Sequence, residues 1–356
     1  MTGKTPPPTH RVVACRGGDR TEIEERPVPK PGDEELLLRL RVVGLCGTDL
    51  YKLGTGAGSP GQVLGHEVVG KIVNKGRRVT RFEDGDRVAV PHHVPCGACH
   101  LCRRGAETMC GVFRENLLEP GGFAEYILVR PRAQNLAARK IPDGLPDEAA
   151  VFMEPAACVL RGVRRAGADG VGAMLILGAG SMGLLHLLVL KALWPEVEVV
   201  VSDPVAERRA HAVRLGADKA VNPSGEAADA IRDMTGGLGA ETVFDTVGGA
   251  QPLGEGLALS REGGAVVLFA HAPEGGRADF EINDLFKHER RVIGTYSGGT
   301  AEQAEIFRLL TEGKLDPAPL ATHRLPLDDF ERGVELARTR QALKVLFTPS
   351  RRSPDA

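Results

Sequence analysis

The chain of 356 residues lacks the features that mark several classes of protein. Lys and Arg total 45 against 47 Asp and Glu, so there is no excess of basic charge for a nucleic-acid partner. Its most apolar stretch, Leu184 to Trp194, is interrupted by His186 and Lys191 and falls well short of the roughly 20 residues that span a bilayer. The sequence therefore predicts a protein that binds neither nucleic acid nor membrane.

The beginning of the chain also lacks an apolar core of the kind that a secretory signal needs. The segment Met1 to Pro8 contains three consecutive prolines, which exclude a helix and predict a disordered tail. Seven cysteines are present, and four of them lie between Cys96 and Cys110. Without an export signal, such a cluster is more readily a metal site than a disulfide framework. We therefore expect a cytoplasmic protein with reduced cysteines.

The chain is long enough for two domains, and the pattern of apolar and turn-forming residues changes near residue 154. From Arg11 to Arg130, short β-branched runs alternate with Gly, Pro and Asp turns, which is typical of an all-β lobe. Beyond Glu154, apolar runs alternate with segments of helical period, which indicates a parallel, doubly wound sheet. That sheet is complete by Tyr296. We predict an α/β domain over 155–296 and a β-rich domain over 1–154 and 297–356.

A glycine-rich turn, Gly178-Ala-Gly180-Ser-Met-Gly183, follows the apolar strand that ends at Leu177 and opens a helical run. Its glycines permit a tight turn, close approach of a pyrophosphate and close packing of helix on strand. Alone, the motif fits an ordinary turn equally well, but Asp203 lies twenty residues farther on, at the tip of the next predicted strand. A carboxylate there can accept hydrogen bonds from ribose hydroxyls. The predicted dinucleotide site comprises Gly178, Gly180, Ser181, Met182, Gly183 and Asp203.

The carboxylate of Asp203 also predicts which dinucleotide binds. It would repel the 2′-phosphate of NADP, so the expected cofactor is NAD. Arg208 and Arg209 follow on the next predicted helix. Solvated charge is the simpler interpretation of both, although Arg208 is a candidate to flank the adenosine.

Four cysteines fall in the spacing Cys96-x2-Cys99-x2-Cys102-x7-Cys110. Four thiolates can close a tetrahedral site, and their softness favours zinc or iron. The first three spacings also match the bacterial ferredoxin motif, so an iron–sulfur cluster is the main alternative. Seven residues rather than three precede the last cysteine, and no Pro follows Cys110, which favours zinc. A zinc ion enclosed by four thiolates would hold the loop in place and take no part in the chemistry.

Two further motifs, Gly44-Leu-Cys46-Gly-Thr48-Asp49 and Gly65-His66-Glu67, place a thiolate, an imidazole and a carboxylate in the predicted β-rich domain. Singly, such residues are more often core residues than ligands. Together with the four-cysteine loop, the run Gly121–Tyr126 and the glycine-rich turn, they stand in the order found in zinc-containing medium-chain alcohol dehydrogenases. The chain resembles this family from Arg11 to about Phe347.

The resemblance implies an α/β protein with a GroES-like catalytic lobe that contains zinc, a Rossmann lobe that contains NAD, and a cleft for the alcohol. It implies two zinc ions per chain, one catalytic and one structural. The family usually forms dimers or tetramers by pairing its Rossmann sheets, so a homodimer or homotetramer is expected.

In this family, Cys46 and His66 would be ligands of the catalytic zinc, and a third protein ligand is needed to leave one position open. The pair Glu154-Pro155 resembles the sorbitol, butanediol and threonine dehydrogenase branch, in which that glutamate lies beside or on the metal. Glu67 resembles a residue that displaces water from the zinc during ligand exchange. It is equally interpreted as a carboxylate beside the ligands. Which carboxylate ligates at rest stays open.

The implied reaction passes a hydride from a secondary alcohol, a polyol or an amino alcohol such as L-threonine to NAD. Thr48 is placed to accept the alcohol proton. Many relatives have a histidine three residues later, where this chain has Tyr51, which with a pKa of about 10 can act only as a hydroxyl relay. His93 matches a histidine near the substrate of threonine dehydrogenases and is the alternative carrier. His271 is better explained as a loop residue.

Two other classes of function compete with this interpretation. Zinc-free quinone or enoyl reductases share the fold but lack the cysteine loop and the zinc ligands. A non-enzymatic zinc-bearing scaffold would need neither Asp203 nor an open metal position. The low aromatic content of 4% gives no sign of a large apolar pocket, so we expect a small polar alcohol as substrate.

Overall fold

The computed structural model describes residues 6–223 and 225–351. Residues 1–5 of the predicted N-terminal tail lie outside the described residues. The chain divides into two compact units, one of residues 1–154 with 299–356 and one of residues 155–298. No helix among the described residues has the length and apolar character needed to cross a membrane.

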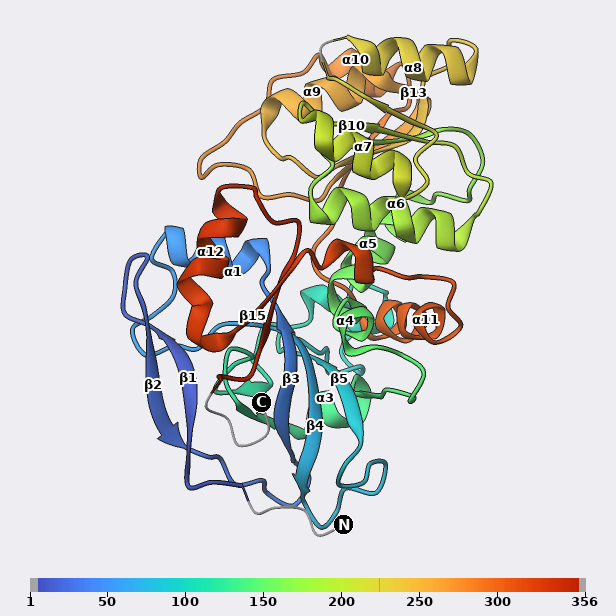
Figure 1. Cartoon of the computed structure of the whole chain (residues 1–356). Coiled ribbons are helices and arrows are strands. Elements are labelled where there is room, and N and C mark those ends of the chain that lie inside the picture. Colours follow the sequence, from blue (N-terminus) through green and yellow to red (C-terminus); the bar gives the residue numbers. More distant parts are fainter. Residues whose placement is uncertain (1–5, 224, 352–356) are drawn as a thin grey trace. The chain divides into compact units, whose positions relative to one another are not determined.

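The first unit is built on a sheet of eight strands, whose central members β3, β4 and β5 are seen side by side in Figure 1. The order is β15-β16-β3-β4-β5-β8, with β7 paired to β3 and β6 paired to β7. The strands are β3 (Leu36–Gly44), β4 (Glu67–Lys75), β5 (Arg87–Pro91), β6 (Leu118–Glu119), β7 (Tyr126–Val129), β8 (Arg139–Lys140), β15 (His323–Pro326) and β16 (Val345–Thr348). A separate hairpin-like pair contains β1 (Thr9–Cys15) and β2 (Thr21–Pro27).

The first unit also contains several helices. The α-helices are α1 (Gly47–Gly54), α2 (His100–Arg103), α3 (Pro131–Leu136), α4 (Asp147–Ala150), α5 (Met153–Ala166, which continues into the second unit), α11 (Thr300–Thr311) and α12 (Phe330–Arg338). Short 3-10 turns occur at η1 (Glu107–Met109), η2 (Ala318–Leu320) and η3 (Leu327–Asp329).

The core of the first unit depends on strand leucines and valines and on a cluster of three phenylalanines. The ring of Phe123 lies 4.8 Å from that of Phe330 and 5.8 Å from that of Phe347. All three side chains are buried, and they come from distant parts of the sequence. The C-terminal segment, with α12 and β16, therefore completes the core begun by the N-terminal strands.

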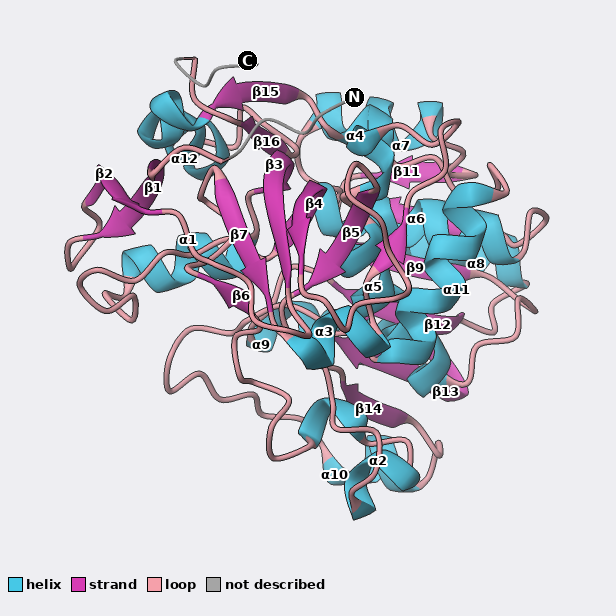
Figure 2. Cartoon of the chain, turned by 90° about the horizontal axis from the view of Figure 1, so that it is seen from below, coloured by secondary structure: helices cyan, strands magenta, loops and turns pink. Residues whose placement is uncertain are grey.

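One edge of β3 is shared between two partners. Its first half pairs with β7, and its end pairs with β16, where Leu346 stands opposite Gly44. Along its other edge β3 pairs with β4, so that Gly44 also stands opposite Glu67. Figure 2 shows β7, β3, β4 and β5 as neighbouring strands. The end of β3 therefore lies between β4 and β16, which positions the site described below.

The second unit is a parallel sheet of six strands in the order β11-β10-β9-β12-β13-β14. Counted along the chain this is 3-2-1-4-5-6, the doubly wound arrangement that binds dinucleotides. The strands are β9 (Met174–Leu177), β10 (Val199–Ser202), β11 (Lys219–Val221), β12 (Ala240–Asp245), β13 (Ser260–Leu268) and β14 (Arg291–Gly294). The helices are α6 (Ser181–Leu193), α7 (Ala206–Arg214), α8 (Glu226–Thr235), α9 (Ala250–Leu259) and α10 (Ile282–Phe286). The predicted α/β fold class is confirmed.

Candidate metal centres and dinucleotide site

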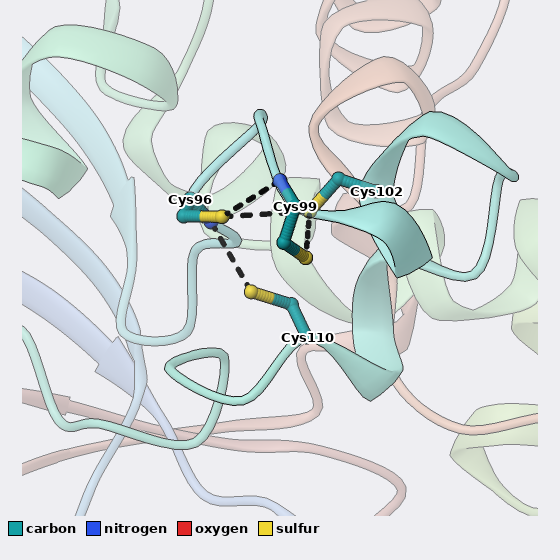
Figure 3. Close-up of side chains that lie close together, drawn as sticks. All are labelled: Cys96, Cys99, Cys102 and Cys110. Carbon is teal, nitrogen blue, oxygen red and sulfur yellow. Dashed lines mark hydrogen bonds between the residues drawn. The ribbon is translucent and has the colours of Figure 1, made fainter.

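The four predicted zinc-binding cysteines come together in one loop. Their sulfur atoms lie within 4.8 Å of one another, although no disulfide joins them. Figure 3 shows the four side chains converging, with the Sγ of Cys99 3.4 Å from that of Cys102. The backbone N–H of Cys96 points at the Sγ of Cys110 at 3.4 Å. A cluster of four sulfurs with no other ligand type fits a closed site for a soft metal ion.

The thiols in this loop differ in their pKa values. Backbone N–H groups of Ala98 and Cys99 lower the pKa of Cys96 to about 6, because they stabilise its thiolate. Desolvation and the neighbouring thiol of Cys99 raise the pKa of Cys102 to about 12. Part of the cluster is therefore ready to bind a cation, while the rest would deprotonate on binding it.

A second group of ligand atoms is formed by Cys46, His66 and Glu67, again within 4.8 Å of one another. Cys46 is the N-cap residue of α1, two residues after the end of β3, while His66 immediately precedes β4 and Glu67 is its first residue. The side chain of Glu67 is fully buried and that of His66 nearly so. One thiolate, one imidazole and a carboxylate match the donor set of an open, catalytic zinc site.

Asp49 is a further candidate for a functional role that the sequence analysis did not select, although it stands within the first motif. Its carboxylate is 1% exposed and accepts hydrogen bonds from the backbone N–H groups of Cys46 at 3.1 Å and Gly65 at 3.2 Å. It also lies 3.4 Å from Nδ1 of His66, which leaves Nε2 for a metal. Burial alone would lower the pKa of His66, but the charges of Asp49 and Cys46 raise it well above its ordinary value. A metal ion at Nε2 would therefore have to displace a proton from this ring.

Glu154 is placed differently from the other predicted ligands. It lies in the first turn of α5 and is 8% exposed. It does not belong to the group formed by Cys46, His66 and Glu67. Glu67, in turn, forms an ion pair with the buried Lys344, a residue that lies in none of the sequence motifs described above.

The candidate proton carriers lie on helix α1 and in the loop after β5. Thr48 and Tyr51 are on α1, and the Tyr51 side chain is partly exposed at 41%. His93 follows β5, stacks on His92 with the ring centroids 3.5 Å apart, and packs against Phe113. Burial, followed by the nearby charges of His66 and Lys52, lowers the pKa of His93 to about 3. His271 is exposed in the loop after β13.

In the second unit the glycine-rich turn joins β9 to α6. Gly178 has a φ of 95°, which favours glycine. A Cβ on Gly183 would stand 1.9 Å from the carbonyl oxygen of Gly178, whereas a Cβ on Gly180 would meet no atom within 4 Å. Gly183 is therefore required for packing, whereas the space beside Gly180 is open. Ser181 and Met182 form the first turn of α6.

Asp203 follows β10 and is buried beside this turn. One carboxylate oxygen accepts the N–H of Ala179 at 2.7 Å, and the other accepts that of Val205 at 2.8 Å. Arg209 donates to the backbone carbonyls of Asp203 and Pro204. Arg208 is half-buried on α7.

Comparison with known proteins places this arrangement in a family. The alcohol dehydrogenase GroES-like domain matches residues 32–143, and the zinc-binding dehydrogenase domain matches residues 170–312. Escherichia coli L-galactonate-5-dehydrogenase is 32% identical over 96% of this chain and 99% of its own length. Pyrococcus horikoshii L-threonine 3-dehydrogenase is 34% identical over 94% of this chain and 97% of its own. The chain belongs to the zinc-binding alcohol dehydrogenase family.

Solved structures of other dehydrogenases have a similar fold. The alcohol dehydrogenase TADH from Thermus sp. is 27% identical, with a TM-score of 0.84 over 95% of this chain and 99% of that one. The 2R,3R-butanediol dehydrogenase of Bacillus subtilis is 25% identical, with a TM-score of 0.85 over 96% of this chain and 100% of that one. The predicted family, the GroES-like and Rossmann folds and the oxidoreductase class are confirmed.

The two glycines of the turn give a paired prediction. Gly183→Ala should lower the free energy of unfolding by about 1–3 kcal/mol, because its methyl group overlaps the Gly178 carbonyl. Gly180→Ala should leave the unfolding midpoint unchanged but weaken NADH binding about tenfold, because the methyl group fills space that a pyrophosphate needs. Thermal unfolding and NADH fluorescence titration measure both effects. Equal losses of stability in the two variants would contradict this division of roles.

Proposed function

We propose that this family member is an NAD-dependent dehydrogenase of a small polar secondary alcohol, a polyol or an amino alcohol such as L-threonine, which it oxidises to the ketone. The observation that carries the proposal is the convergence of Cys46, His66 and Glu67, whose ligand atoms lie within 4.8 Å of one another. The names of its relatives support the substrate class, since they include L-threonine, sorbitol and butanediol dehydrogenases.

The two clusters suit two zinc ions with different tasks. Cys46 and His66 would hold the catalytic ion, with Glu154 or Glu67 as the third ligand, and the four clustered cysteines, Cys96, Cys99, Cys102 and Cys110, would hold the structural ion. When bound, the catalytic zinc supplies a Lewis acid that lowers the pKa of the alcohol. Asp49 orients the His66 ring through Nδ1 and so fixes the nitrogen that binds.

The dinucleotide would bind at the turn after β9. The N-terminus of α6 offers backbone N–H groups to a pyrophosphate, and the open space at Gly180 admits it. Asp203 would accept the ribose hydroxyls, since it already lies against the turn through Ala179. Arg208, on α7, would flank the adenosine. The carboxylate disfavours a 2′-phosphate, which supports NAD over NADP.

The route of the alcohol proton begins at Thr48 and continues through Tyr51. Both residues lie on α1, which starts at the ligand Cys46, and the partly exposed Tyr51 is placed to pass a proton to solvent. His93, the alternative carrier, is packed between His92 and Phe113. This packing makes Tyr51 the better candidate.

We further propose that the protein is a homodimer or a homotetramer in the cytoplasm. β14 is the last strand of its sheet, so one edge has no strand partner among the described residues. Ile282 and Phe286, on the preceding helix α10, are 78% and 77% exposed. An open edge beside exposed apolar side chains suits the same edge of a second copy. Seven free cysteines suit a reducing compartment.

The direct test is metal analysis combined with turnover. The purified protein should contain two zinc ions per 37.9-kDa chain, and mild chelation should remove one of them and abolish NADH formation. A screen of secondary alcohols, polyols and L-threonine with NAD identifies the substrate, and light scattering of the same sample gives the number of chains. Cys46→Ala should lack only the labile ion. Iron with visible absorption, or no NADH from any alcohol, would contradict the proposal.

Asp203→Ser tests the choice of cofactor. Loss of the carboxylate should raise the KM for NAD and narrow the preference for NAD over NADP, because the repulsion of the 2′-phosphate is removed. Steady-state kinetics with both cofactors measure the change. A wild-type enzyme that prefers NADP would show that Asp203 does not select the cofactor.

Tyr51→Phe tests the proton route. If the hydroxyl relays the proton, kcat should fall at least about tenfold while NADH affinity changes little, since acid–base groups contribute about a hundredfold or more. His93→Asn is the matched control. A large loss in His93→Asn, with Tyr51→Phe near wild type at every pH, would transfer the role to His93.

A further inference from the structure

A lysine on helix α1 lies on the same face of the helix as the proposed proton acceptor. The helix begins directly after Cys46, and its buried side chains are Asp49 and Leu53. Thr48 and Lys52, which are four residues apart, are both half-buried. Side chains at this spacing point the same way, with their Cβ atoms about 5–6 Å apart. The Lys52 side chain therefore lies one helical turn from that of Thr48.

The charge of Lys52 also acts on the two stacked histidines beside the metal site. The ring centroid of His92 lies 4.6 Å from that of His66 and 3.5 Å from that of His93. Burial lowers the pKa of both stacked rings, and the positive charges of His66 and Lys52 lower it further. The Lys52 ammonium group is therefore close enough to influence a ring that packs against His66.

A second cation acts on the same stack. His93 donates a hydrogen bond to the backbone of Arg114. Burial lowers the pKa of His93 most, and the charge of Arg114 adds to this effect. Arg114 follows the buried Phe113, whose ring packs against that of His93. Two positive charges, one from α1 and one from the loop after η1, therefore lie close to the proposed metal site.

The carboxylates of the metal site do not neutralise Lys52. Asp49 contacts His66, and Glu67 is paired with Lys344. Within the described part of the chain, Lys52 forms no ion pair with an acidic side chain. A half-buried ammonium group has lost part of its hydration, so it attracts an anion more strongly than a fully solvated one. This leaves Lys52 available to an anionic ligand.

We propose that Lys52 binds an anionic group of the substrate, a carboxylate or a phosphate, while the alcohol oxygen lies at Thr48. The inference deepens the proposed function and rests on it. The substrate is then a hydroxy acid or a phosphorylated polyol, whose charge lies a few bonds from the carbon that loses the hydride. An ammonium group suits both anions, because it is a compact charge with three hydrogen-bond donors. Arg114 adds to the positive potential that attracts such substrates.

The test compares compounds that differ in charge but share a carbon skeleton. One set is sorbitol, D-gluconate and sorbitol 6-phosphate, and the other is L-threonine and L-threoninamide. Binding to the zinc-loaded protein is measured by calorimetry with NADH present, because an alcohol cannot react with NADH. At least one anionic compound should bind about tenfold or more tightly than its counterpart without the anionic group. Gluconate against sorbitol 6-phosphate then distinguishes a carboxylate substrate from a phosphate.

Variants of Lys52 show whether this residue causes the preference. Lys52→Met should bring the affinities for anionic and neutral compounds to within about threefold of each other, with little change for sorbitol. Lys52→Arg, which keeps the charge, should retain most of the preference. In turnover with NAD, the loss in Lys52→Met should appear in KM rather than in kcat. Lys71→Met, which removes an exposed charge from β4, is the matched control and should behave like wild type.

Three results would overturn the proposal: failure of every anionic compound to bind, equal binding of charged and uncharged compounds by wild type, or an unchanged preference in Lys52→Met. If Lys52→Met does not fold, added salt decides the question. It should weaken the binding of the anionic compounds alone, and salt-independent binding would overturn the proposal. Failure of the proposed function is seen separately, because no compound would then yield NADH while calorimetry would still report the charge preference.

Discussion

The pairing of β3 with β4 is the constraint on which the metal centre depends. Because Gly44 stands opposite Glu67, the residues just after β3 and just before β4 meet at the same end of the sheet, although Cys46 and His66 are far apart in sequence. Asp49 then secures the geometry by accepting hydrogen bonds from both segments. The third strand, β16, brings Lys344 to the same place, so the C-terminal segment completes the site as well as the core.

Both candidate sites follow one physical pattern, in which a strand ends at a helix N-terminus and a glycine removes a side chain where backbone or ligand must come close. At the end of β3, Gly44 admits the pair of Glu67 and Lys344, and Cys46 caps α1. At the end of β9, Gly183 permits α6 to pack against the turn. The chemistry differs because the first site presents thiolate, imidazole and carboxylate, while the second presents backbone N–H groups and Asp203.

Features that are local in the sequence could be predicted, and features that depend on distant pairing could not. The four-cysteine loop and the glycine-rich turn are each contained in a few residues, so their spacing alone indicated the convergence or the turn now seen. Lys344 lies 277 residues from Glu67. Lysines are normally exposed, and Lys344 stands just before β16, which begins at Val345. The contacts of Asp49 could not be predicted either, because they are made with Gly65 and His66, which lie on a neighbouring segment.

The central claim is that the chain holds two metal ions at sites of different character, one mixed and one all-sulfur. Anomalous X-ray diffraction from crystals of the purified protein, recorded on both sides of the zinc absorption edge, tests it most directly. We predict two zinc peaks per chain, one bounded by Cys46 and His66, and one amid the four clustered cysteines. A single peak, or a signal at the iron edge in the cysteine loop, would contradict this account.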